Sequence, residues 1–181
     1  MISYTERYPC AQAEYLQKTG ELLQHRVSQA FKELKFKTKI CKGQGNGVDL
    51  FVYDQEGNLL LVIEMLNWSP RSYLSAPRKT SIIENLSEFT CARLLIYTTM
   101  KNEDMLRDLK LYNIDLLKLD FQILPRLFHN YFERQNRVLL REIDSDGTQR
   151  HITNRIFRYM QSLNLHLGVL DSEAIVKRDS V

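Results

Sequence analysis

The sequence contains few cysteines, and this shortage excludes the protein classes that depend on them. The three present, Cys10, Cys41 and Cys91, are spread over a chain of 181 residues. Because their number is odd and their spacing is wide, we expect neither a disulfide framework nor a zinc site built from cysteine pairs. A reducing, cytoplasmic setting fits this use of cysteine best.

Long hydrophobic runs are also missing. No uninterrupted apolar stretch approaches the roughly 20 residues that a membrane-spanning helix needs. The N-terminal segment MISYTERYPC contains no apolar signal region. We therefore expect a soluble protein with no membrane partner.

Several familiar site patterns are incomplete. The glycine-rich segment 43–47 superficially resembles a dinucleotide-binding fingerprint, but the pattern after it predicts a strand, and the fingerprint requires a helix there. The acidic turn 144–147 lacks the correctly placed glycine of a calcium loop, and Arg155 stands where the closing glutamate belongs. No paired or HExxH-like spacing occurs among the histidines, which are His25, His129, His151 and His166.

The excess of positive charge is small. The chain has 25 Lys and Arg against 22 Asp and Glu, so its net charge of +3 does not by itself indicate a nucleic-acid partner. The distribution is more informative, because Lys35, Lys37 and Lys39 alternate along one segment and arginines recur through residues 126–158. Such basic segments suit a polyanion, but they suit a solvated surface equally well.

The N-terminal half shows a helix followed by strands. Apolar residues at helical spacing predict a long helix over residues 11–36, with Gly20 as a point where it could divide. Alternation over residues 36–41 predicts an edge strand with a wet lysine face. The apolar runs 48–53 and 59–66 predict a β-hairpin with Gly57 in its turn.

The remaining elements complete an α/β pattern. Helices are predicted over residues 73–89, with Pro77 in the first turn, and over residues 102–111, alternating with strands at 93–99 and 114–119. A strand–helix–strand unit of this length implies parallel neighbours. The predicted order is therefore α-β-β-β-α-β-α-β, with a mixed central sheet flanked by helices.

The C-terminal third is predicted to be a helical extension. Residues 121–143 are expected to be helical after Pro125, and apolar spacing predicts a second helix over 149–165. We therefore expect three parts, which are a core at 1–122, a helical extension packed on it at 123–170, and a flexible tail at 171–181.

Two carboxylates interrupt the apolar runs of the hairpin. Asp49 lies near the start of the first run, and Glu64 lies within the second. A buried ionised carboxylate is costly unless a cation or hydrogen-bond donors offset it. Two such groups on paired strands could share Mg²⁺ or Mn²⁺, which favours oxygen ligands. Glu21 of the first helix is a candidate third ligand, although a solvated helical glutamate is the alternative.

These elements, with the segments GVDLFVYD and LLLVIEMLNW, resemble the PD-(D/E)xK nuclease superfamily, and most of all its archaeal Holliday-junction-resolvase and Mrr-like branches. The resemblance covers about residues 14–120 and implies a restriction-endonuclease-like core. By position, Asp49 corresponds to the family's metal-binding Asp and Glu64 to the Glu of its E-x-K element. Glu21 corresponds to the first-helix Glu of resolvase-like members. The resemblance implies a magnesium-dependent endonuclease that acts on DNA, including branched or structured DNA.

One position departs from the family pattern. The family lysine two residues after the Glu is replaced here by Leu66, which can neither polarise water nor stabilise an oxyanion. Lys79 is the first candidate to supply the missing cation, because it opens the helix that follows the Glu64 strand. Lys39 and Lys42, on the adjacent strand and loop, are the second candidates.

Two functions remain open at this stage. The first is DNA cleavage, in which Arg78 and Arg71, together with Lys39 and Lys42, would contact the nucleic-acid backbone. The second, motivated by Leu66, is a catalytically degenerate module of the same fold that binds nucleic acid or a protein partner. In either case the arginine-rich C-terminal helices are the candidate interface of a homodimer.

Overall fold

The fold is known from a computed structural model that describes residues 9–41, 47–124, 141–143 and 146–167. The elements occur in the order α2 (Pro9–Glu33), β1 (Lys37–Ile40), β2 (Leu50–Tyr53), β3 (Leu59–Leu66), α3 (Ala76–Ser87), β4 (Ala92–Tyr97), the 3₁₀ helix η1 (Glu103–Tyr112), β5 (Asp115–Lys118), β6 (Gln122–Leu124), β7 (Arg141–Ile143) and α5 (Asp146–Leu167). The predicted order of the core is confirmed, except that its last helix is a 3₁₀ helix.

A five-stranded mixed sheet forms the centre of the molecule, with strand order β1-β2-β3-β4-β5. β1, β2 and β3 pair antiparallel, whereas β3, β4 and β5 pair parallel. The hairpin turn contains Gly57 at a φ of +91°, as its place in the sequence predicted. The predicted α/β class with a mixed, helix-flanked sheet is therefore confirmed.

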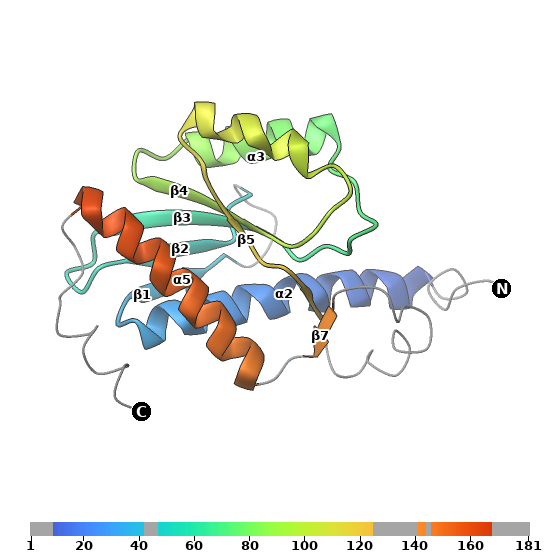
Figure 1. Ribbon diagram of the computed structural model, residues 1–181, viewed down its shortest axis with the longest axis horizontal. Coiled ribbons are helices and arrows are strands. Elements are labelled where there is room, and N and C mark those ends of the chain that lie inside the picture. Colours follow the sequence, from blue (N-terminus) through green and yellow to red (C-terminus); the bar gives the residue numbers. More distant parts are fainter. Residues whose placement is uncertain (1–8, 42–46, 125–140, 144–145, 168–181) are drawn as a thin grey trace.

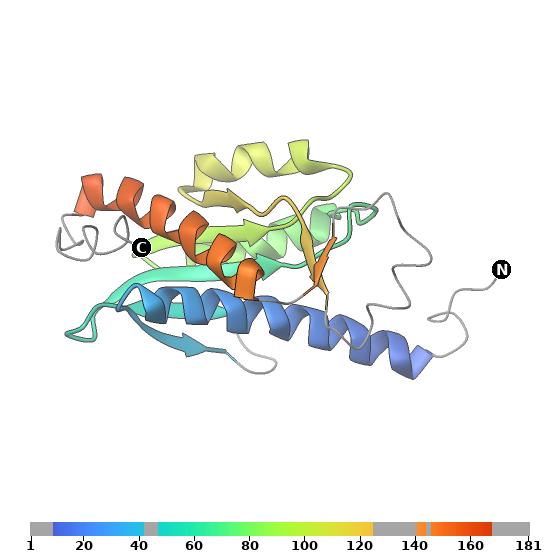
Figure 2. The same cartoon turned by 60° about the horizontal axis from the view of Figure 1, so that its bottom comes forward.

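Helices cover both faces of this sheet. Figures 1 and 2 show α2 and α5 on one face, and α3 and η1 on the other. The first layer buries Leu23 and Phe31 of α2 together with Ile156 of α5. The second layer buries Ile82 of α3 and Leu109 of η1. Each such side chain contributes about 1.5 to 3 kcal/mol when it is fully buried, so the two layers hold the sheet rigidly between them.

The long first helix is continuous. α2 runs through Gly20 without the division that the sequence allowed, and it ends before Lys35, which has a φ of +71°. The following strand, β1, exposes Lys37 and Lys39 and half-buries Ile40, as expected for a sheet edge. None of the helices in the described part of the chain combines the length and apolar character that crossing a bilayer requires.

The start of α3 is fixed by a helix cap. The Ser75 hydroxyl accepts a hydrogen bond from the Arg78 backbone N–H, and Pro77 lies in the first turn as predicted. The helix begins later than predicted because the preceding segment is tied to another loop. Asn102 accepts a hydrogen bond from the Leu74 N–H and donates one to the Leu74 carbonyl.

The C-terminal segment differs from its prediction. Residues 141–143, the expected end of a helix, form β7 (Arg141–Ile143) instead, which pairs in parallel with β6 (Gln122–Leu124), a strand before Pro125 that was not predicted. Residues 125–140, where the helix after Pro125 was expected, lie outside the described residues, as does the predicted tail at 171–181. The predicted final helix is confirmed as α5, which packs on the same sheet face as α2.

A single buried asparagine anchors β6 to the core. The Asn67 side chain donates hydrogen bonds to the carbonyls of Thr19 (2.8 Å) and Ile123 (2.9 Å), and it accepts one from the Ile123 N–H (3.0 Å). Asn67 directly follows β3, so it links that strand to α2 and to β6. The hydrogen bonds of the Ile123 backbone in β6 are thus made by a residue far away in the sequence. For this reason the local pattern of apolar residues did not predict β6.

We expect Asn67→Ala to lower the free energy of unfolding by about 2 to 4 kcal/mol, because it leaves buried backbone groups without partners. Asn58→Ala is the matched control, since Asn58 is exposed in the hairpin turn and its side chain donates to the nearby Asp54 carboxylate. Urea unfolding of both variants provides the measurement. Equal losses of stability in the two variants would contradict the anchoring role of Asn67.

Candidate functional site

Asp49 and Glu64 lie next to each other on the paired strands of the hairpin. The register of β2 and β3 pairs Leu50 with Ile63, and the Asp49 N–H donates to the Ile63 carbonyl at 2.9 Å. Asp49 therefore lies just before β2, beside the part of β3 that carries Glu64. β-Pairing thus brings the backbones of the two acids close together, whereas their side chains meet different helices.

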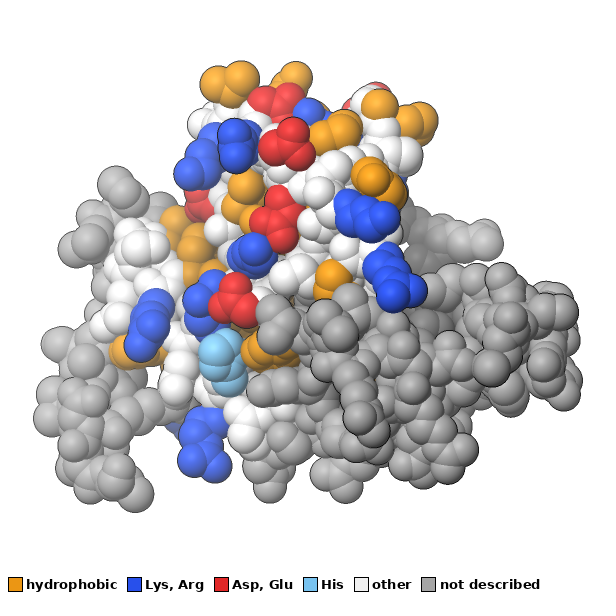
Figure 3. Space-filling model, turned by 45° about the vertical axis from the view of Figure 1, so that its right-hand side comes forward, with side chains coloured by type: hydrophobic (Ala, Val, Ile, Leu, Met, Phe, Trp, Pro, Cys, Tyr) orange, Lys and Arg blue, Asp and Glu red, His pale blue; other side chains and the backbone are white. Residues whose placement is uncertain are grey.

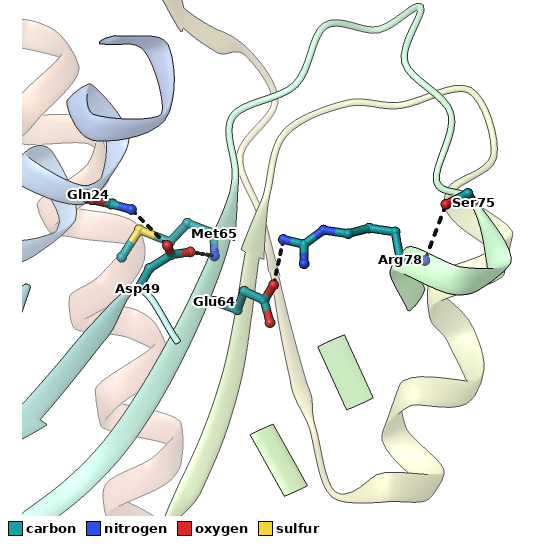
Figure 4. Close-up of polar contacts among 6 residues, drawn as sticks. All are labelled: Gln24, Asp49, Glu64, Met65, Ser75 and Arg78. Carbon is teal, nitrogen blue, oxygen red and sulfur yellow. Dashed lines mark hydrogen bonds and ion pairs between the residues drawn. The ribbon is translucent and has the colours of Figure 1, made fainter. Parts of the chain in front are cut away.

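The Asp49 carboxylate is held by uncharged donors. The Gln24 side-chain amide of α2 donates to Oδ1 at 2.7 Å, and the Met65 backbone N–H donates to Oδ2 at 2.7 Å (Figure 4). Burial raises the pKa of Asp49, and these hydrogen bonds, together with the charge of Arg78, offset that rise only in part. Each oxygen of this carboxylate therefore already has one partner and a fixed direction.

The Glu64 carboxylate has a different environment. Its side chain is 0% exposed, and its Oε1 lies 2.6 Å from a guanidinium nitrogen of Arg78 on α3 (Figure 4). This contact is an ion pair between opposite charges, and no described group other than Arg78 donates to either Glu64 oxygen. Burial raises the pKa of Glu64 to about 7 despite Arg78, and the neighbouring charge of Asp49 contributes to the rise.

The two carboxylates are held from opposite helical layers. Figure 4 shows Asp49 beside Gln24 of α2 and Glu64 directed toward Arg78 of α3. The charges nevertheless interact, since each carboxyl pKa depends on Arg78 and that of Glu64 also depends on Asp49. The site therefore lies at the hairpin, between the α2 layer and the α3 layer.

The described carboxylates do not form a metal site ligated by protein groups alone. Within the described ranges, no group of three or more His, Cys, Asp or Glu side chains could hold a metal ion. The predicted trio of Glu21, Asp49 and Glu64 is therefore not assembled. Glu21 is exposed on α2, one helical turn before Gln24. Magnesium often binds through one or two carboxylates and retains several waters. The Glu64 oxygens, whose described polar contact is Arg78, would suit such a role.

The favoured lysine lies elsewhere. The Lys79 ammonium is 2.5 Å from Asp108 of η1, so it does not return to the Glu64 strand as expected. Successive helical residues point about 100° apart, and on α3 it is Arg78 that faces β3. Helix phase alone did not separate the two cations, because Arg78 precedes the buried Ile82 by four residues and Lys79 precedes it by three, so both lie near its face.

The other predicted cations are dispersed. Lys39 is exposed on β1, Arg71 is exposed in the loop after β3, and Lys42 lies outside the described residues. Figure 3 shows Lys and Arg side chains interspersed with Asp and Glu on one face of the molecule. Leu66, which stands in place of the motif lysine, is 2% exposed and belongs to the apolar cluster beneath α3. No cation therefore stands at the motif position.

A glycine brings the entry of β2 close to α3. Gly47 has a φ of +64°, and a Cβ added there would collide with the side-chain amide of Asn85. Asn85 lies two helical turns after Arg78, on the same side of α3. Gly47 therefore permits a close approach between the segment that carries Asp49 and the helix that carries Arg78.

We expect the charge of Glu64 to make the protein less stable as the pH rises. Its pKa is about 7 in the folded state against 4.5 for the free side chain, so its contribution to stability is complete below pH 4.5 and is lost as the pH rises through 7. By this shift, Glu64→Gln should be more stable than wild type at pH 8 by at most about 3 kcal/mol, with little difference at pH 4.5.

Thermal unfolding at the two pH values measures this effect, with Glu84→Gln as the control because Glu84 is exposed on α3, the helix that carries Arg78. A pH-independent difference between Glu64→Gln and wild type would show that the charge of Glu64 is not the cause.

We expect Gly47→Ala to destabilise the fold by about 1 to 3 kcal/mol, from its positive φ and its collision with Asn85. The double variant Gly47→Ala with Asn85→Ala should recover part of the loss. Gly20→Ala is the control, since it lies within α2 with open space around its Cα, and should be neutral or stabilising. Chemical denaturation measures all four proteins. A Gly47→Ala variant as stable as Gly20→Ala would contradict the close approach.

Comparison with protein-family models, curated proteins and solved structures gives no match to this chain. The resemblance to PD-(D/E)xK nucleases thus rests on the order of the elements and on the positions of Asp49 and Glu64. The function must be argued from the chemistry of this site.

Proposed function

We propose that the protein is a metal-dependent endonuclease that hydrolyses phosphodiester bonds in DNA, with Asp49 and Glu64 as its metal-binding residues. The observation that carries this proposal is the presence of two carboxyl groups with raised pKa values on neighbouring segments of one hairpin, one facing α2 and the other facing α3. Such an arrangement destabilises the protein in the absence of a ligand, and perturbed acids of this kind concentrate at functional sites.

The architecture around the carboxylates supports the same proposal. A helix, three antiparallel strands, a second helix and a parallel strand follow one another from α2 to β4. This is the order expected of a restriction-endonuclease-like core, with Asp49 and Glu64 at the expected strands. We therefore place the chain, as a proposal, in the PD-(D/E)xK superfamily.

The roles of the residues follow from their contacts. Bound Mg²⁺ or Mn²⁺ would supply an activated water and neutralise charge on the scissile phosphate. Gln24 and the Met65 amide would keep Asp49 oriented, so that its carboxylate needs little rearrangement. Arg78, whose side chain is 39% exposed, would be accessible to a phosphate of the substrate.

A second candidate function is a degenerate nuclease-fold module that binds DNA or a protein without cutting. The burial of Leu66 favours it, because no cation occupies the motif position and Lys79 is paired with Asp108. In this case the Asp49–Glu64 pair would remain without a cation suited to stabilising the charge that develops during hydrolysis.

Homodimer formation and a branched-DNA substrate remain parts of the proposal. The apolar side chains Ile152, Ile156 and Met160 of α5 are buried against the chain's own core. A dimer formed through this helix would therefore use its other, more polar side.

The decisive experiment is single-turnover cleavage of linear, nicked and four-way DNA with Mg²⁺ or Mn²⁺. We expect Asp49→Asn to lower the rate by about 10²-fold or more. Asp104→Asn, an exposed change on η1, serves as the matched control and should leave the rate unchanged.

Binding without cleavage by the wild-type protein would favour the degenerate module. Absence of both binding and cleavage would overturn the proposed function. Leu66→Lys is a weaker probe, because a charge introduced at this buried position would test folding as much as chemistry.

A further inference from the structure

The ion pair between Arg78 and Glu64 joins an accessible cation to an inaccessible anion. The Arg78 side chain is 39% exposed, whereas the Glu64 side chain is 0% exposed, and their closest atoms are 2.6 Å apart. The backbone at Arg78 is fixed, since its N–H bonds to Ser75 at the cap of α3. Any movement of the guanidinium therefore involves rotation of the long side chain toward solvent and leaves the helix in place.

The charges at the site are not balanced by their contacts. Asp49 accepts hydrogen bonds from two uncharged donors, Gln24 and the Met65 N–H. Glu64 has the Arg78 ion pair, and no other group within the described part of the chain donates to either of its oxygens. Among the described side chains that contact the two acids, Arg78 is the one that carries positive charge. A divalent cation at the pair would therefore compete with Arg78 for Glu64.

We propose that Arg78 is a displaceable counterion, which neutralises Glu64 in the absence of metal, leaves it when a divalent cation binds, and then holds a phosphate of the substrate. This inference rests on the proposed function. Arginine suits both partners, because the guanidinium fork matches carboxylate and phosphate oxygens alike. Since it stays protonated in proteins, it acts as a positioning residue and does not accept a proton from water.

The neighbouring Lys79 provides a natural contrast. It carries the same charge one position away on α3, but its ammonium is paired with Asp108 at 2.5 Å and points to η1. Removing its charge changes the net charge of the protein by the same amount, without freeing Glu64. The pair of variants Arg78→Gln and Lys79→Gln therefore separates local displacement from a general effect of net charge.

The first measurement is Mn²⁺ binding to the DNA-free protein by isothermal titration calorimetry. We expect Arg78→Gln to bind Mn²⁺ about 5-fold more tightly or better, whereas Lys79→Gln should change the affinity by less than about twofold. Arg78→Lys keeps a cation beside Glu64 and should stay close to wild type. Thermal unfolding of each variant confirms that the fold is retained.

The second measurement is binding of a cleavage-resistant phosphorothioate duplex, with and without Mn²⁺. We expect Mn²⁺ to strengthen duplex binding by wild type and Lys79→Gln more than by Arg78→Gln, because only the first two retain a guanidinium that the metal releases.

An Arg78→Gln variant whose Mn²⁺ affinity equals or falls below that of wild type would overturn the counterion role, while Mn²⁺ binding by wild type would leave the proposed function intact. If wild type and both glutamine variants bind no Mn²⁺ at millimolar concentration, the proposed metal site itself is wrong, and the counterion role is wrong with it.

Discussion

A fully buried carboxylate on the middle strand of a sheet must be opposed by a cation, and this requirement shapes the α3 side of the molecule. Glu64 lies in β3, between β2 and β4. Arg78 meets it because the Ser75 cap and Pro77 set where α3 begins, and thereby set which of its residues face the sheet. The buried Ile82 follows on the same face. The ion pair and the apolar packing of α3 thus depend on one helical phase.

The opposite layer holds the second acid by different means. Gln24 of α2 and a backbone amide of β3 fix Asp49, so its charge is solvated by dipoles, while that of Glu64 faces a guanidinium. Each layer of helices consequently contributes to one half of the same site. Both carboxyl groups have raised pKa values, because burial outweighs these contacts. A protein that needed only a stable core would gain by having apolar residues at both positions.

The departures from the nuclease pattern concentrate on the cation. Leu66 is part of the apolar cluster under α3, and Lys79 turns away to Asp108. The positive charge at the acids comes instead from an arginine, which can bind oxyanions but does not exchange protons near neutral pH. If the protein is the nuclease proposed above, this substitution would affect the catalytic step more than binding. Cleavage of DNA and binding without cleavage therefore remain the two candidate functions, and rate measurements distinguish between them.

Local pattern in the sequence determined the order of helices and strands, the hairpin around Gly57, the wet lysine edge and the adjacency of Asp49 and Glu64. These features depend on periodicity, turn chemistry and strand pairing between close neighbours in the chain. Only the tertiary structure decided that Arg78 reaches Glu64 while Lys79 does not, that Glu21 stays apart from the two acids, and that β6 docks on Asn67. Each of these outcomes depends on the angle at which a helix or a distant segment packs against the sheet, and that angle results from side-chain packing between residues far apart in sequence.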